Sequence, residues 1–559
     1  MHTPVNATYS RSAIFFFAAL AVLLVMRVAG IMATPLNLGP DEAQYWRWAQ
    51  DPAWGYYSKP PMIAWVIAAT TAIFGNAEWA VRLAAPVLHG VAATALFGLG
   101  RAMYGDRAGL LAGLGYLLMP GVVLSSAVIS TDGVLLPFWS MALYCFWRLR
   151  SETGGWASAV TLGICVGIGF LAKYAMLYFA VGTALAIISD PPSRKALLTL
   201  KGGAALALTL SIFAPHLVWN AANEFQTVGH TVDNANLGGP LFNPENAGKF
   251  LTDQMGVFGP ISFLALLFGG LVMRRSDGEG VLARDRWLLG FIVPVLVIIL
   301  VQAVISRAHA NWAATAYPAA SVLVAAWMTR AGPAPRLWVT IAVITFIAAL
   351  FIPDMALIGR LTIGTGIAGT ALLFGWLFSG RPEGLLWAGM SIHAVLAVAF
   401  TAVAVGPVGW SEQLGLTNAF KRTRGWEETS TQVLAAARAA NATAILVDER
   451  ENWHGLDYYL KDEDHPPLIS WRRYNGVKSF AESRPLTDDI DDRVLVVSMR
   501  PIFRPRMRAD FDQFSASGSI TIALGGDRTR DLKVYLASEF DPLPRDSAWE
   551  ARFEGLSED

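Results

Sequence analysis

Long apolar segments recur along most of the chain, and this feature limits the folds that it can adopt. A helix needs about 20 predominantly apolar residues to cross the hydrocarbon core of a bilayer. Hydrophobic residues make up 54% of the 559 residues and charged residues only 15%, which is less charge than a soluble protein of this length carries. The sequence therefore predicts a polytopic α-helical membrane protein.

We predict about thirteen transmembrane helices, each close to the length that a bilayer requires. They lie at 13–33, 80–103, 108–126, 132–149, 157–172, 174–189, 203–219, 257–273, 287–305, 312–329, 337–353, 361–378 and 385–407. The short adjacent segments at 157–172 and 174–189 indicate a tight helical hairpin. No Ala-x-Ala cleavage signal follows the first segment, so we expect it to be retained and not removed as a signal peptide.

Basic residues set the expected orientation. They fall in alternate loops, for example at Arg148 and Arg150, at Arg274 and Arg275, and at Arg330, and the positive-inside rule makes those loops cytoplasmic. The opposite loops then face outward: 34–79, 127–131, the turn near Lys173, 220–256, 306–311, 354–360 and everything after 408. The long polar loop at 220–256 either orders over a substrate or is simply mobile.

The distribution of charge divides the chain into two predicted domains. Roughly half of the charged residues follow Gly409, in little more than a quarter of the chain. We therefore expect a transmembrane catalytic domain at 1–410 and a soluble domain at 411–559. The latter alternates predicted helices at 427–440 and 452–460 with predicted strands at 444–447, 493–498, 520–524 and 533–536. This order is typical of a small α/β domain.

The first outer loop, 34–79, holds the densest group of ionisable and aromatic residues. Asp41 and Glu42 follow directly on the first apolar segment, and Lys59 lies close behind them. Charges at a membrane surface are costly unless they are solvated or paired, so this group is a candidate functional site. The aromatic residues of the loop, which include Tyr45 and Tyr57, fit short helices that lie in the membrane interface. The competing interpretation is a plain solvated loop.

Three further polar points fall on the same predicted side. Asp132 lies in Ser-Thr-Asp-Gly, Lys173 in Phe-Leu-Ala-Lys-Tyr, and Arg307, His309 and Asn311 lie in one short stretch. Together with the first loop they suit one reaction: an acid deprotonates an acceptor hydroxyl, while cations hold a phosphate that leaves with negative charge.

Each of these residues also has a simpler interpretation. Asp132 could only cap its helix, Lys173 could snorkel to the headgroups, and Arg307 could contact anionic lipid alone. His309 could be an ordinary loop residue. Glu42 could tune Asp41 or help to bind a metal, and the sequence does not decide which of the two carboxylates is the base.

Five motifs in residues 10–410 give the chain a resemblance to a known family. They are the Asp-Glu of Pro40–Ala43, the Tyr-Ser-Lys-Pro-Pro of Tyr57–Pro61, Ser130–Asp132, Phe170–Lys173 and Arg307–Trp312. The chain resembles the GT-C membrane glycosyltransferases of families 39 and 83, the protein mannosyltransferase type. It is most similar to their bacterial branch, which includes the lipid A aminoarabinose transferase and the rhizobial galacturonosyl transferases.

The resemblance implies an inverting glycosyltransferase in the bacterial inner membrane. It would move a sugar from a polyprenyl phosphate to a periplasmic acceptor, lipid A or the lipopolysaccharide core, with both the site and the C-terminal domain on the periplasmic side. The implied catalytic residues are Asp41, with Asp132 and Glu42 as further acids. The implied phosphate-binding residues are Lys59, Lys173, Arg307 and His309, and the implied substrate-binding residues are Tyr45, Tyr57 and Asn311.

One departure from the family leaves the sugar open. The aminoarabinose transferase group has Glu-Pro-Pro where this chain has Ser58, Lys59, Pro60 and Pro61. The cation, Lys59, is therefore one position away from its place in the family pattern. For this reason the identity of the sugar cannot be transferred to this chain.

Other functions stay open as alternatives. The acceptor could be a Ser or Thr of a secreted protein, or the chain could be a lipid-linked substrate transporter or flippase. A transporter would place ionisable groups near the bilayer midplane, often in inverted repeats; here they cluster at one interface. A scaffold that acts through its C-terminal domain is a further alternative.

The sequence does not indicate any particular cofactor, and we expect no nucleic-acid partner. A divalent cation at Asp41 and Glu42 would have too few ligands to be argued.

Overall fold

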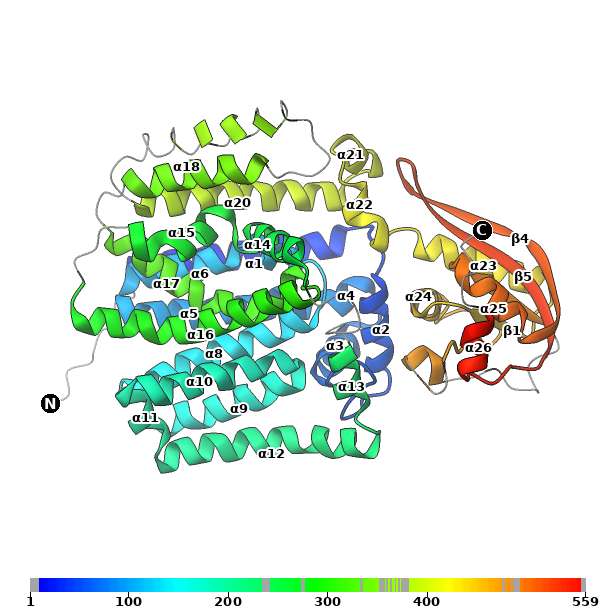
Figure 1. Cartoon of the computed structure of the whole chain (residues 1–559), viewed down its shortest axis with the longest axis horizontal. Coiled ribbons are helices and arrows are strands. Elements are labelled where there is room, and N and C mark those ends of the chain that lie inside the picture. Colours follow the sequence, from blue (N-terminus) through cyan, green and yellow to red (C-terminus); the bar gives the residue numbers. More distant parts are fainter. Residues whose placement is uncertain are drawn as a thin grey trace. The chain divides into compact units, whose positions relative to one another are not determined.

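Two compact units make up the part of the chain that the computed structural model describes (Figure 1). The described residues are 10–233, 242–272, 277–331, 335–350, 382–474 and 493–553, with short pieces between 357 and 372 and between 477 and 486. The first unit comprises Met1–Ala29, Leu83–Ala222 and Thr231–Ala399. The second comprises Gly30–Arg82, Asn223–His230 and Phe400–Asp559. The second unit thus combines the first predicted outer loop with the C-terminal region, and the predicted domain boundary at 410 and 411 stays a prediction.

The first unit is helical throughout its described residues. Its elements are α1 (Arg11–Ala33), α5 (Ala84–Tyr104), α6 (Asp106–Leu117), α7 (Pro120–Ser125), α8 (Thr131–Arg150), α9 (Trp156–Ala172), η1 (Tyr174–Met176), α10 (Leu177–Ser189), α11 (Pro191–Leu197), α12 (Leu200–Ala222), α14 (Pro244–Phe258), α15 (Pro260–Val272), α16 (Glu279–Ile305), η2 (Ala310–Ala316), α17 (Tyr317–Arg330), α18 (Pro335–Leu350) and α20 (Pro382–Val405). The last residues of α1 and of α20 belong to the second unit, and α13 (Gln226–Asp233) is divided between the two units. Within the predicted outer loop 220–256, the described residues form α13 and most of α14, which corrects the expectation of a loop there.

Several of these helices can cross a membrane. Among the described residues, five are long and apolar enough to do so, or up to seven if two bent helix pairs each count as one span. Each predicted segment other than 361–378 falls mainly on helical residues, and five of them (80–103, 108–126, 174–189, 257–273 and 312–329) each fall on two consecutive helices. Most of 361–378 lies outside the described residues. A polytopic helical membrane protein is therefore confirmed, whereas the number thirteen stays a prediction.

Glycine allows the helices of the first unit to approach closely. A Cβ atom on Gly109 of α6 would lie 2.7 Å from the carbonyl oxygen of Phe97 on α5, and one on Gly163 of α9 would lie 2.5 Å from that of Ala205 on α12. Real Cβ atoms do not tolerate such distances. Small residues at these positions are typical of membrane helices, whose association depends on close packing because lipid offers no hydrophobic drive.

Ion pairs connect side chains near the ends of different helices, next to loops that the sequence predicts to be cytoplasmic. Arg150 donates to both carboxylate oxygens of Asp190, at 2.8 and 2.7 Å. Asp285 accepts from Arg330 and from the hydroxyl of Tyr104, each at 2.7 Å. These contacts satisfy charges that would otherwise be costly at a membrane boundary.

The second unit combines short helices with a mixed sheet. Its elements are α2 (Pro40–Ala49), α3 (Met62–Phe74), α4 (Glu78–Arg82), α21 (Val408–Gln413), α22 (Thr417–Phe420), η3 (Lys421–Thr423), α23 (Trp426–Ala439), β1 (Ala444–Val447), α24 (Arg450–Tyr459), β2 (Leu468–Ser470), η4 (Phe480–Ser483), β3 (Val494–Ser498), η6 (Pro501–Phe503), α25 (Arg504–Arg508), β4 (Phe511–Gly525), β5 (Arg528–Phe540) and α26 (Ser547–Arg552).

The sheet has the strand order β2-β1-β3-β5-β4. Strand β1 is parallel to β2 and β3, while β5 is antiparallel to β3 and β4. Helices α23 and α24 cover one face through Val433, Trp453 and Leu456, and Met507 and Trp549 lie in the hydrophobic core of the other. The prediction of a small α/β domain is thus confirmed. The sequence located only the apolar parts of β4 and β5, because much of this long hairpin is exposed.

Candidate active site

The Asp-Glu motif lies in the first turn of α2. Gly39 precedes the helix in an extended conformation, and Pro40 occupies the first helical position, where its missing N–H has no cost. The amide of Gly39 donates to Oε2 of Glu42 at 2.9 Å. Acidic side chains are favoured at this end of a helix by its dipole. The motif therefore fixes where α2 begins.

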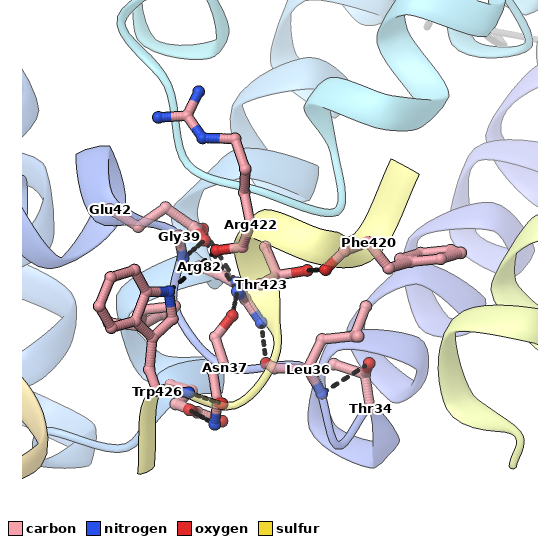
Figure 2. A network of polar contacts seen from close by, with 12 residues as sticks. Thr34, Leu36, Asn37, Gly39, Glu42, Arg82, Phe420, Arg422, Thr423 and Trp426 are labelled. Atoms are coloured by element: carbon pink, nitrogen blue, oxygen red, sulfur yellow. Dashed lines mark hydrogen bonds and ion pairs between the residues drawn. The ribbon is translucent and has the colours of Figure 1, made fainter. Parts of the chain in front are cut away.

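Glu42 is held in a buried ion pair with Arg82, the last residue of α4. The Nε and Nη2 atoms of Arg82 donate to the two carboxylate oxygens at 2.9 and 2.8 Å. The side chains are only 5% and 2% exposed. Arg82 also donates to the backbone oxygens of Leu36 and Asn37, at 2.9 and 2.7 Å. Figure 2 shows this network, in which the Glu42 carboxylate faces the guanidinium.

The same network reaches the start of α23. The Asn37 side chain accepts the backbone N–H of Trp426 at 2.9 Å, and the Trp426 indole donates to the carbonyl of Arg422 at 3.0 Å (Figure 2). Arg82 therefore joins the segment after α1, the start of α2 and, through Asn37, the start of α23 in the C-terminal region.

Asp41 has a different environment from its neighbour. Its side chain is 49% exposed, and Oδ1 accepts a hydrogen bond from Nη2 of Arg450 at 3.3 Å. The sequence left open which of the two carboxylates is the base. Because both oxygens of Glu42 face a buried guanidinium, the geometry favours Asp41 as the carboxylate that a substrate can reach.

Several aromatic residues of the first loop pack on one another. Tyr45 is 7% exposed and lies against Trp48, whose ring also stacks on Tyr56 at 4.6 Å between centroids. Burial raises the pKa of Tyr56 to about 12. Tyr57 lies 5.5 Å from the ring of His230.

Lys59 occupies the turn that follows these aromatic residues. Its carbonyl oxygen accepts the amide of Tyr56 at 3.1 Å, and its side chain is half-buried. The turn therefore holds Lys59 at a defined point of the loop.

Three other motifs meet at Asp132 in the first unit. The ammonium of Lys173 donates to Oδ1 of Asp132 and the amide of Asn311 donates to Oδ2, both at 2.7 Å. Asp132 is 8% exposed. The helix cap is Ser130, whose hydroxyl oxygen accepts the amide of Gly133 at 3.2 Å. Asp132 therefore does not serve as the N-cap, and it anchors one cation and one amide instead.

Arg307 and His309 are exposed in the segment before η2. The His309 ring lies 5.2 Å from that of Trp312. Partial burial lowers the pKa of His309, and the positive charges of Arg307, Lys249 and Lys173 lower it further. His309 therefore lies close enough to three basic side chains to be affected by their charge.

Sequence reasoning missed three of these residues. Arg82 falls inside a predicted apolar span, Arg450 lies far along the chain from Asp41, and Lys249 stands in a loop that lacked any recognisable motif. Of the three, only Arg82 could have been recognised from the sequence. It lies at the start of a predicted apolar segment, where a charge needs a partner. Among the residues that the structure describes, no group of three His, Cys, Asp or Glu side chains could hold a metal ion.

Comparison with known proteins identifies the family. Residues 58–219 match the family described as dolichyl-phosphate-mannose-protein mannosyltransferase. The lipid A galacturonosyltransferase RgtD of Rhizobium johnstonii is 32% identical over 431 residues, which cover 76% of this chain and 78% of RgtD. The chain belongs to this family of GT-C membrane glycosyltransferases. It is therefore a glycosyltransferase, as the motifs predicted.

Two further relatives agree with this assignment. The lipopolysaccharide core galacturonosyltransferase RgtB of the same organism is 27% identical over 51% of this chain and 60% of its own length. The solved structure of ArnT from Cupriavidus metallidurans bound to undecaprenyl phosphate has a TM-score of 0.63 at 16% identity, over 94% of this chain and 97% of ArnT. The latter shows a shared fold and confirms the expected GT-C architecture.

The contrast between the two adjacent carboxylates generates a stability prediction. Glu42→Gln should lower the free energy of unfolding by about 3–5 kcal/mol, because it leaves Arg82 buried without its counter-charge. Asp41→Asn breaks only a half-exposed pair and should change it by about 1 kcal/mol or less. Thermal unfolding of the two purified variants in the same detergent measures the difference. Equal melting temperatures would contradict the assigned roles.

Proposed function

We propose that this enzyme transfers galacturonic acid from a polyprenyl phosphate to lipid A. The observation that carries the proposal is the match to a lipid A galacturonosyltransferase over 431 residues and 78% of that protein. The donor class is supported by an undecaprenyl phosphate-aminoarabinose arabinosyl transferase of Pseudomonas fluorescens, which is 27% identical over 150 residues, 24% of this chain and 27% of its own length. The named relatives do not favour a protein acceptor or a transporter.

The proposal includes the location of the enzyme. The chain crosses the bacterial inner membrane about thirteen times, and both the first outer loop and the C-terminal region lie on the periplasmic side. Basic residues in alternate loops support this orientation. Lipid A and a lipid-linked donor are both membrane-borne, so both substrates can reach a membrane enzyme from within the bilayer.

Asp41 is the proposed general base. It takes the proton of an acceptor hydroxyl, and the oxygen attacks the anomeric carbon from the face opposite the phosphate. The new carbon–oxygen bond forms as the bond to the phosphate breaks, and the anomeric configuration inverts. The half-exposed side chain of Asp41 supports this role, whereas Glu42 holds the helix that carries it.

The cationic residues are proposed to bind the donor phosphate. Lys173 has three ammonium donors, and Asp132 uses one of them at 2.7 Å. Asp132 and Asn311 therefore fix the cation while its other donors can contact a phosphate oxygen. Lys59, Arg307 and His309 are proposed to assist, and Tyr45 and Tyr57 to shape the substrate site. No nucleotide-sugar site is needed, since the donor is already lipid-linked.

Replacement of the proposed base tests the reaction. Asp41→Asn should lower transfer by about 10²–10⁴-fold, the usual contribution of a positioned general base. Mass spectrometry of lipid A, core oligosaccharide and secreted glycoproteins would compare cells that lack the enzyme with cells complemented by wild type or by the variant. We expect loss of one uronic acid from lipid A, restored by wild type alone.

The same spectra separate the alternatives. Loss from the core oligosaccharide would replace lipid A by another lipopolysaccharide acceptor, and a mass change in secreted proteins would favour protein O-glycosylation. Full restoration by Asp41→Asn at normal protein level would exclude Asp41 as the base.

A second prediction concerns Lys173. Lys173→Met combined with Asp132→Asn removes the cation without leaving a buried carboxylate unpaired, and should weaken binding of undecaprenyl phosphate about 10–100-fold, as expected for one lost charge-assisted hydrogen bond. Native mass spectrometry of the purified protein with undecaprenyl phosphate measures the affinity. Lys195→Met is the matched control, because Lys195 forms an exposed pair with Glu152. Equal affinity of all three proteins would exclude Lys173 from the phosphate site.

A further inference from the structure

Helix α24 of the C-terminal region packs directly on α2. The rings of Trp46 and Tyr458 meet edge to face, 4.9 Å apart. The hydroxyl of Tyr458 donates to the carbonyl of Asn76 at 2.6 Å, and the hydroxyl of Tyr459 accepts the amide of Leu38 at 2.7 Å. These contacts lie at the C-terminal end of α24, where they hold it in one register against α2 and the segments that flank α2.

This register places Arg450, the first residue of α24, beside the proposed base. Its Nη2 donates to Oδ1 of Asp41 at 3.3 Å, and its Nη1 donates to Oε1 of Gln44 at 2.7 Å. Asp41 and Gln44 are three residues apart and therefore share one face of α2. Gln44 is 2% exposed, so it gives the guanidinium a rigid anchor.

The charged neighbours of Arg450 already have other partners. Glu449 pairs with Arg500 at 3.2 Å and Glu451 with Arg422 at 2.6 Å. Further along α24, Asp457 faces Arg47 of α2 at 3.8 Å.

His454 lies between these charges and adds none of its own. It is 1% exposed, and burial lowers its pKa well below the usual value, with a further contribution from Arg450 and Arg47. Asp41 is accordingly the carboxylate toward which the Arg450 guanidinium is directed.

We propose that Arg450 is a positioning residue for Asp41, supplied by the C-terminal region. The proposal rests on the proposed function, in which Asp41 is the base. The Nη1 atom of the guanidinium is hydrogen-bonded to Gln44, and the Nη2 atom is hydrogen-bonded to Oδ1 of Asp41. This second hydrogen bond restricts the rotation of the carboxylate about its side-chain bonds. The second oxygen, Oδ2, is then presented to the acceptor hydroxyl. The C-terminal region thereby takes part in catalysis, and does not merely cover the site.

The consequence is a defect in turnover and not in binding. A misplacement of the base by about 1 Å can cost about 10²-fold in rate. Arg450→Ala should therefore lower kcat about 10–100-fold, with unchanged KM for donor and acceptor. Arg450→Lys should restore part of the loss, because it keeps one donor near Oδ1. In the Asp41→Asn background, Arg450→Ala should have no further effect on the residual rate.

The test uses the full-length enzyme with a polyprenyl-phosphate-linked galacturonic acid and lipid A in detergent micelles. Arg422→Ala is the matched control, since it removes a cation that pairs with Glu451 on the same helix but does not contact Asp41. Wild-type kcat in Arg450→Ala would overturn the proposal, and so would a raised KM at constant kcat, which would make Arg450 a substrate ligand.

Two further outcomes are separable. Should Arg450→Ala unfold, Arg450→Met replaces it, because it keeps an apolar side chain of similar length but has no donor for Oδ1; wild-type kcat in that variant overturns the proposal as well. Full activity of Asp41→Asn would instead show that the base assignment fails, whatever the behaviour of the Arg450 variants.

Discussion

The buried ion pair of Glu42 and Arg82 is the interaction on which the candidate site depends. Removing two charges from water is costly, and such a pair is tolerated only when its remaining donors and acceptors are satisfied. Here the backbone oxygens of Leu36 and Asn37 and the amide of Gly39 complete it. The pair therefore fixes the start of α2 and, through Asn37, the start of α23. The position of Asp41 follows from both.

Two adjacent carboxylates thus have different tasks because they have different surroundings. Glu42 faces inward to a guanidinium and stabilises the fold, while Asp41 keeps half of its surface exposed and is available for chemistry. Asp132 resembles Glu42 in being buried against a cation, since it accepts a hydrogen bond from the ammonium of Lys173. Glu42 and Asp132 thus each orient a cation, whereas Asp41 is the carboxylate proposed to accept a proton.

Much of this could be predicted from the sequence, because hydrophobic length and periodicity act locally. The helices and the α/β character of the C-terminal region followed from such patterns, as did the motifs that meet at Asp132. The number of spans did not follow, since α6 ends at Leu117 and α7 begins at Pro120, and since two other helix pairs bend by 114° and 113°. Arg82 and Arg450 could not be predicted, because their partners are set by packing between distant segments.

The anomeric configuration of the product tests the central claim most directly. Purified enzyme would be given a polyprenyl-phosphate-linked galacturonic acid of known configuration together with lipid A, and the new linkage would be determined by NMR after a single turnover. A single displacement with Asp41 as the only base inverts the anomeric carbon, so we expect the opposite configuration in the product. Retention would require a second displacement through a covalent intermediate or a front-face attack, and would contradict the account.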